Sequence, residues 1–150
     1  MKWLWFHTTL IFGGFAAFAA SVASAGMYLS QSRQLKSKRL GKYFSRLPSL
    51  DRLDRIHFRF LSAGVILLSL GILSGLFWAR DMRRFGELLK DPRAILSFLT
   101  CLMYWAVLTV RASALRRGQK IATSTILIFL LLVASWASSY TVSSGLHRSF

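Results

Sequence analysis

Residues 60–79 read FLSAGVILLSLGILSGLFWA, a run without a single charged side chain. At about 1.5 Å per residue, a helix of this length crosses the roughly 30 Å hydrocarbon core of a bilayer. Three further stretches are also free of charge, residues 3–32, 94–110 and 121–146. The sequence therefore predicts an all-α integral membrane bundle of four transmembrane helices, over about residues 5–30, 60–79, 94–110 and 121–143.

The composition excludes several other classes of protein. The chain of 150 residues is 54% hydrophobic and carries a net charge of +15. A disordered basic tail would be far less hydrophobic, and a soluble domain would spread its charges along the chain. No basic face is interleaved with stacking aromatics, so we expect contact with anionic lipids and no nucleic-acid partner.

The single cysteine, Cys101, falls inside the third apolar stretch. One cysteine allows neither a disulfide framework nor the paired motif that attaches haem covalently. We expect Cys101 to serve as a small apolar side chain.

Charge placement predicts how the chain threads the membrane. Most of the 20 lysines and arginines lie in the first and third loops, at positions 33, 36, 38, 39, 42, 46, 52, 55, 59, 111, 116, 117 and 120. Short loops rich in Lys and Arg stay on the cytoplasmic side. We therefore expect a multi-pass protein of a bacterial-type cytoplasmic membrane with both termini outside.

The first apolar stretch has a second interpretation. Lys2, the apolar run and the small residues Ala23, Ser24 and Ala25 are also typical of a cleaved secretory signal. Cleavage there would leave the most basic loop outside, against the charge rule, so an uncleaved span is favoured.

Small residues recur at helical spacing in two spans. Gly64, Gly71 and Gly75 lie in the second, and Gly13 and Ala17 lie in the first. Small side chains let helix backbones approach closely within lipid. These positions are predicted to be packing faces.

The segment before the second span carries a helix start. Ser49 can cap free amides, and Asp51 would lie in the first turn. Beyond it, Leu53, His57 and Leu61 share one face, which predicts a short helix lying at the cytoplasmic interface. We expect His57 to contact the interface or lipid headgroups, and Arg93 and Arg111 to snorkel from the ends of the short third span.

Two of the three histidines, His7 and His147, are predicted to lie on the outer side. Two imidazoles on one face of a bundle can supply both axial ligands of a haem iron, or bind another transition metal. Histidine, tryptophan and tyrosine also populate the membrane interface without any ligand, and this alternative stays open.

The order of several segments resembles the cytochrome c assembly family, which includes CcsA-type and HemX-type membrane proteins. The resemblance rests on residues 6–8 (FHT), 47–55 (LPSLDRLDR), 70–75 (LGILSG) with Trp78, 91–93 (DPR) and 145–150 (GLHRSF). It covers nearly the whole chain, so residues 1–150 are expected to form one membrane domain of this type.

The resemblance implies a function. In that family two outward-facing histidines ligate haem on the extracytoplasmic face, and the matching residues are His7 and His147. Trp78, Asp91 and Arg93 would line or position this site for a non-covalent, b-type haem. Arginines 80, 83 and 84 would supply positive charge to the propionates. A partner membrane protein of cytochrome c maturation is implied as well.

Two departures from the family pattern keep an alternative open. Residues 80–90 contain no tryptophan where the assembly factors have a tryptophan-rich loop, and Thr109 stands where they have an intramembrane histidine. The chain is therefore closer to the HemX-like branch, as a short member, half of a split protein or a fragment.

The alternative function is a structural or regulatory membrane subunit of the same system that binds no haem. A transmembrane electron carrier is weaker, because only His57 is available on the inner side. No nucleophile and base pair or phosphate loop is recognisable, so we expect no enzymatic activity.

Overall fold

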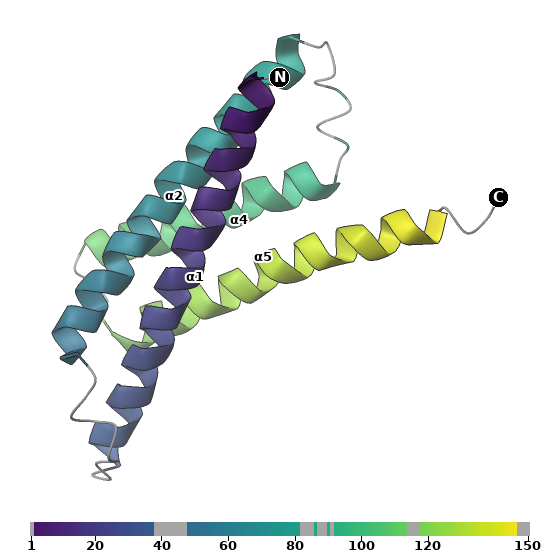
Figure 1. Cartoon of the computed structure of the whole chain (residues 1–150). Coiled ribbons are helices and arrows are strands. Elements are labelled where there is room, and N and C mark those ends of the chain that lie inside the picture. The colour runs from purple at the N-terminus through teal and green to yellow at the C-terminus, as the bar shows by residue number, and fades with distance from the viewer. Residues whose placement is uncertain are drawn as a thin grey trace.

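The computed structural model describes residues 2–37, 48–81, 86, 90, 92–113 and 118–146. Four helices follow one another along the chain: α1 (Lys2–Lys36), α2 (Leu50–Asp81), α4 (Pro92–Ala112) and α5 (Gln119–Leu146) (Figure 1). No strand occurs in these residues. The predicted all-α class is confirmed.

Three of the helices are long and apolar enough to cross a membrane, over Trp3–Lys36, Leu50–Arg80 and Ala94–Ala112. In α5 the apolar part found among the described residues is the shorter segment Gln119–Ala134. The chain is thus a helical membrane bundle, and three of its four predicted spans lie in helices that are long and apolar enough to cross a membrane.

The helices α1 and α2 lie side by side in opposite directions along most of their length (Figure 1). The other two helices cross this pair, and the N-terminal end of α4 and the C-terminal end of α5 extend away from it on the same side (Figure 1). The helices α1 and α2 therefore pack together along most of their length, whereas the N-terminal end of α4 and the C-terminal end of α5 lie apart from them (Figure 1).

Glycines form the seam between α1 and α2. A Cβ added to Gly64 would lie 2.7 Å from Cδ1 of Phe18, and one added to Gly71 would lie 2.6 Å from Cδ1 of Ile11. A Cβ added to Gly14 would lie 3.3 Å from the backbone nitrogen of Leu68. The two backbones therefore approach closely at Gly14, and the missing side chains of Gly64 and Gly71 leave room for Phe18 and Ile11. The predicted packing faces are confirmed.

The core between α1, α2 and α4 is built around two aromatic rings. Phe18 and Tyr104 are fully buried and stack with centroids 4.0 Å apart and planes 7° apart. Cys101 is buried beside them, with its Sγ 3.5 Å from Oγ of Ser69. Its predicted role as a small packed side chain is confirmed.

The predicted start of α2 is confirmed, whereas the separate interfacial helix is wrong. Ser49 Oγ accepts a hydrogen bond from the Arg52 amide at 3.4 Å, as a capping residue does. From Leu50 the helix continues without a break to Asp81. The apolar face of its first turns packs inside the bundle rather than on lipid, since Leu53 and Leu61 are buried.

His57 does not contact lipid headgroups as expected, because it is buried at 2% exposure. Its Nε2 lies 3.2 Å from Oγ1 of Thr125 on α5. The Thr125 hydroxyl donates its own hydrogen to the Ile121 carbonyl, so it accepts a hydrogen from His57. The hydrogen bond to Thr125 offsets the free-energy cost of burying the imidazole.

Arg111 does not snorkel either, since it is only 9% exposed. Its guanidinium forms an ion pair with the Asp54 carboxylate and lies over the ring of Phe58, 5.4 Å from the centroid. The Asp54 carboxylate therefore stabilises the Arg111 guanidinium inside the bundle, in place of the water that it would reach at the membrane surface. At the other end of α4, the Arg93 side chain lies outside the described residues.

Polar contacts join the start of α5 to the end of α1. Gln119 donates a hydrogen bond to Ser32 Oγ at 2.7 Å and accepts one from Lys36 Nζ at 3.0 Å. Gly118, with φ of 101°, begins the turn into α5, and the Tyr28 hydroxyl lies 3.0 Å from the place of an added Cβ. A side chain at Gly118 would therefore be strained as well as crowded.

Candidate functional site

A pocket of about 580 Å³ lies between the N-terminal part of α1, the C-terminal part of α2 and the start of α4. Its walls are mostly apolar and include two tryptophans and a phenylalanine, Trp3, Trp78 and Phe98, with His7 among them. Small-molecule sites measure roughly 300–1,000 Å³ and combine apolar walls with a few polar groups. The pocket has the size and character of such a site.

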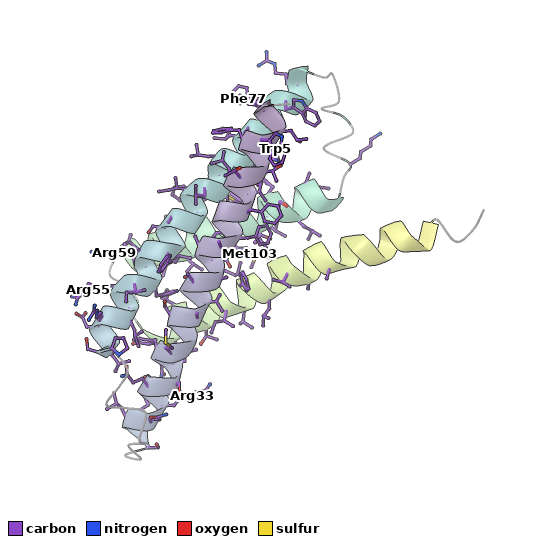
Figure 2. The ribbon with its side chains drawn as sticks, in the orientation of Figure 1. Trp5, Arg33, Arg55, Arg59, Phe77 and Met103 are labelled. Atoms are coloured by element: carbon purple, nitrogen blue, oxygen red, sulfur yellow. The ribbon has the colours of Figure 1, made fainter. Side chains whose placement is uncertain are left out.

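The pocket lies at the end of the α1–α2 pair that carries exposed aromatic side chains. Trp5 is 73% exposed and Phe77 is 64% exposed, and both lie at this end (Figure 2). Arg33 lies towards the opposite end of the pair, and Arg55 and Arg59 lie on the half of α2 away from the aromatic side chains (Figure 2). These basic side chains therefore lie away from the end of the pair that holds the pocket.

His7 is the polar group at the centre of the site. Its Nδ1 lies 2.9 Å from the Gly71 carbonyl oxygen and 2.9 Å from Oγ of Ser74. A Cβ added to Gly75 would lie 3.1 Å from Cε1 of His7, so the imidazole lies directly against the backbone of α2. One turn earlier on α1, the Trp3 indole nitrogen donates to the Ser74 carbonyl at 3.3 Å.

The structure brings together two of the predicted site residues, because His7 and Trp78 line the same pocket. Arg93 lies in the first turn of α4, directly before Ala94, and Ala94 also lines the pocket. Asp91 and His147 lie outside the described residues. The assignment of these five residues to one site stays a prediction.

The last described turn of α5, which ends at Leu146, extends away from the N-terminal end of α1 (Figure 1). Within the described part of the chain, His7 is the histidine that lines the pocket. In the same part of the chain, no group of three or more His, Cys, Asp or Glu side chains could hold a metal ion. Any metal held at the pocket by described residues would rest on His7.

The sequence did not identify Gly71 and Ser74 as partners of His7. Both belong to the Gly-x-x-x-Gly segment that ends at Gly75, which was interpreted only as a packing face. The missing information is the register of two antiparallel helices. Moving from Gly64 to Gly71 and Gly75 along α2 shifts the contact from Phe18 to Ile11 and His7, by the same number of residues back along α1.

These features define a helical membrane protein with an apolar, imidazole-bearing pocket at one end of the bundle. The family described as "Cytochrome C assembly protein" matches residues 1–147. The chain belongs to the cytochrome c assembly protein family, and the resemblance found in the sequence is confirmed.

Two curated proteins illustrate the similarity. "Protein HemX" of Brevibacillus brevis is 34% identical over 131 residues, which cover 87% of this chain and 47% of that protein. "Cytochrome c biogenesis protein CcsA" of Prochlorococcus marinus (strain MIT 9312) is 26% identical over 166 residues, covering 97% of this chain and 53% of that protein. The chain thus spans about half the length of these relatives. No solved structure matches it.

Proposed function

We propose that the chain binds a non-covalent, b-type haem in the pocket and handles it during cytochrome c biogenesis. Membership of the assembly family supports the biogenesis role. The observation that carries haem binding is the position of His7, whose imidazole lines an apolar pocket with its Nδ1 side held by Gly71 and Ser74.

The chemistry of the pocket fits haem. A porphyrin needs apolar walls, aromatic contacts and a nitrogen ligand for its iron, and the walls here provide Trp3, Trp78, Phe98 and His7. Bound haem supplies the iron chemistry, whereas the protein supplies ligation and a water-poor surface. The role proposed is that of a carrier, not of an enzyme.

His147 would hold the haem iron together with His7, and Asp91 and Arg93 would position the haem. Positive charge for the propionates would come from Arg80, which ends the described part of α2 with Asp81, and from Arg83 and Arg84.

The site is proposed to face the extracytoplasmic side of a bacterial-type cytoplasmic membrane, with both termini outside. The distance between the pocket and the basic end of the α1–α2 pair supports this orientation, because basic loops stay in the cytoplasm. A partner membrane protein of cytochrome c maturation would deliver or receive the haem.

The haem site can be tested by reconstituting the purified protein with haem in detergent. We expect a six-coordinate spectrum that is lost in His7→Ala and changed in His147→Ala. The control is His57→Gln, because its amide keeps a donor for Thr125 and the residue lies outside the pocket. A six-coordinate spectrum that persists in the His7→Ala, His147→Ala double variant contradicts the site.

The orientation can be tested with single cysteines in a Cys101→Ser background. Lys2→Cys at the start of α1 is expected to react with a membrane-impermeant maleimide in intact cells, and Ser37→Cys at its other end only after lysis. The reverse pattern would place the pocket on the cytoplasmic side.

A second candidate function is a structural or regulatory membrane subunit that binds no haem. The absence of tryptophan from residues 80–90, where the assembly factors carry a tryptophan-rich loop, favours it. This function predicts a stable complex with a partner membrane protein and no haem after extraction. Copurification of haem at near-stoichiometric yield would contradict it.

A further inference from the structure

The hydrogen bonds around His7 determine which of its ring nitrogens carries the proton. The Gly71 carbonyl oxygen can only accept, so Nδ1, at 2.9 Å from it, must donate. Ser74 Oγ donates its own hydrogen to the same carbonyl at 2.7 Å, which leaves its lone pairs facing Nδ1. The neutral ring is therefore protonated on Nδ1 and has its free lone pair on Nε2.

Nothing in the described part of the chain forms a hydrogen bond to His7 Nε2, and the imidazole lines the pocket. A metal-ligating histidine characteristically donates its other ring N–H to a carbonyl, a carboxylate or a water, which fixes the tautomer and raises the basicity of the ligating nitrogen. The arrangement at His7 has this form.

We propose that Ser74 is a positioning residue for His7: together with the Gly71 carbonyl it holds the Nδ1–H tautomer and presents Nε2 to the ligand of the pocket. The identity of that ligand as haem rests on the proposed function. The tautomer itself does not, because every group that holds it belongs to the chain.

The rest of the site supports the position of the Ser74 hydroxyl. Ser74 is 5% exposed, so water does not compete freely for its Oγ. The indole of Trp3 donates to the Ser74 carbonyl and links this turn of α2 to the start of α1. Gly75 leaves room for the ring, because an added Cβ would lie 3.1 Å from Cε1 and crowd it against its two oxygen partners.

The tautomer is measurable without haem, by nitrogen NMR of protein labelled at its three histidines. The His7 signals are assigned by their loss in His7→Ala. We expect Nδ1 to be protonated in the parent protein. In Ser74→Ala one of the two acceptors is lost and the ring can turn away from the Gly71 carbonyl, so we expect a larger share of the tautomer protonated on Nε2. Ser74→Thr keeps the hydroxyl and should restore the parent spectrum. Protonation of Nε2 in the parent protein, or identical spectra in Ser74→Ala, would overturn the inference.

Haem titration gives the second measurement. Loss of an outer hydrogen-bond partner typically weakens metal binding about 10–100-fold. We expect a decrease of this order in Ser74→Ala, with a higher reduction potential because the imidazole becomes a weaker donor to the iron. Ser74→Thr should restore both values. The matched control is Ser62→Ala on the same helix, whose hydroxyl donates to the Phe58 carbonyl one turn before it.

Gly75→Ala provides an independent variant, with Gly26→Ala, which has open space around it, as its control. We expect Gly75→Ala to bind haem more weakly and Gly26→Ala to bind it like the parent protein. The helix content should be unchanged in both variants. If the parent protein binds haem and Ser74→Ala binds it with equal affinity and potential, the role of Ser74 is wrong and the proposed function stands. If the parent protein binds no haem, the proposed function fails, and the nitrogen spectra still decide the tautomer.

Discussion

Arg111 near the end of α4 donates a hydrogen bond to Asp54 in the first turns of α2, and both side chains are largely buried, at 9% and 18% exposure. The ring of Phe58 covers the guanidinium. Two charges removed from water in this way depend strongly on each other, because an unpaired buried charge is costly. The pair therefore connects two helices that meet far from the pocket.

Asp54→Ala is expected to destabilise the bundle, because it leaves the Arg111 charge buried without a partner. Breaking such a pair typically costs about 3–5 kcal/mol of unfolding free energy. The control is Asp51→Ala one turn earlier, whose ion pair with Arg55 is exposed at 73% and 64% and contributes about 0–1 kcal/mol. Unfolding in detergent measures both, and equal losses would contradict the role of the buried pair.

Gly64→Ala is expected to separate α1 from α2, because the new Cβ would lie 2.7 Å from the Phe18 ring. Overpacking of this kind costs about 1–3 kcal/mol. Gly26→Ala is the matched change in a helix with nothing within 4 Å, and it should leave stability equal or slightly higher. A thermal unfolding scan that ranks Gly64→Ala with Gly26→Ala would show that the seam is not tight.

Tyr104→Phe is expected to keep or raise stability. The Tyr104 hydroxyl is buried and has no hydrogen-bond partner among the described residues, a situation that costs about 1–3 kcal/mol. The stacked contact with Phe18 survives in this variant. Tyr104→Leu removes the stacking as well and should lower the midpoint of unfolding, so a loss of equal size in Tyr104→Phe would reveal a partner for the hydroxyl.

Thr125→Val is expected to loosen α5 from the bundle, because His57 Nε2 then loses its acceptor inside the core. An unsatisfied buried group costs about 1–3 kcal/mol. Thr123→Val is the control, since that hydroxyl is exposed and donates to the Gln119 carbonyl of its own helix. Protease sensitivity of α5 and unfolding in detergent should both separate the two variants.

The helices were predictable from the sequence, and the partners of their polar residues were not. Charge-free runs identify membrane helices because lipid tolerates few charges, and small residues identify packing faces because they permit close approach. Ser49 identified the start of α2 because a cap depends only on local spacing.

The errors at His57 and Arg111 share one cause. Each residue was assigned to the interface because polar groups in lipid are costly, but each finds its partner on a helix distant in sequence, Thr125 and Asp54 respectively. The same limit applies to the candidate site. His7 was identified from its residue type and place, whereas Gly71 and Ser74 required the register of α1 against α2.

The glycine seam also constrains how the molecule can move. At Gly14 and Gly64 the backbones of α1 and α2 are in close contact. Rotation of either helix about its axis would bring larger side chains into this contact, so the two helices would have to separate first. The wall of the pocket that carries His7 is therefore stiff, while the wall formed by Ile95 and Phe98 belongs to a helix that diverges from the pair (Figure 1). We therefore expect changes in the size of the pocket to come from movement of α4, because α1 and α2 are held together along the glycine seam.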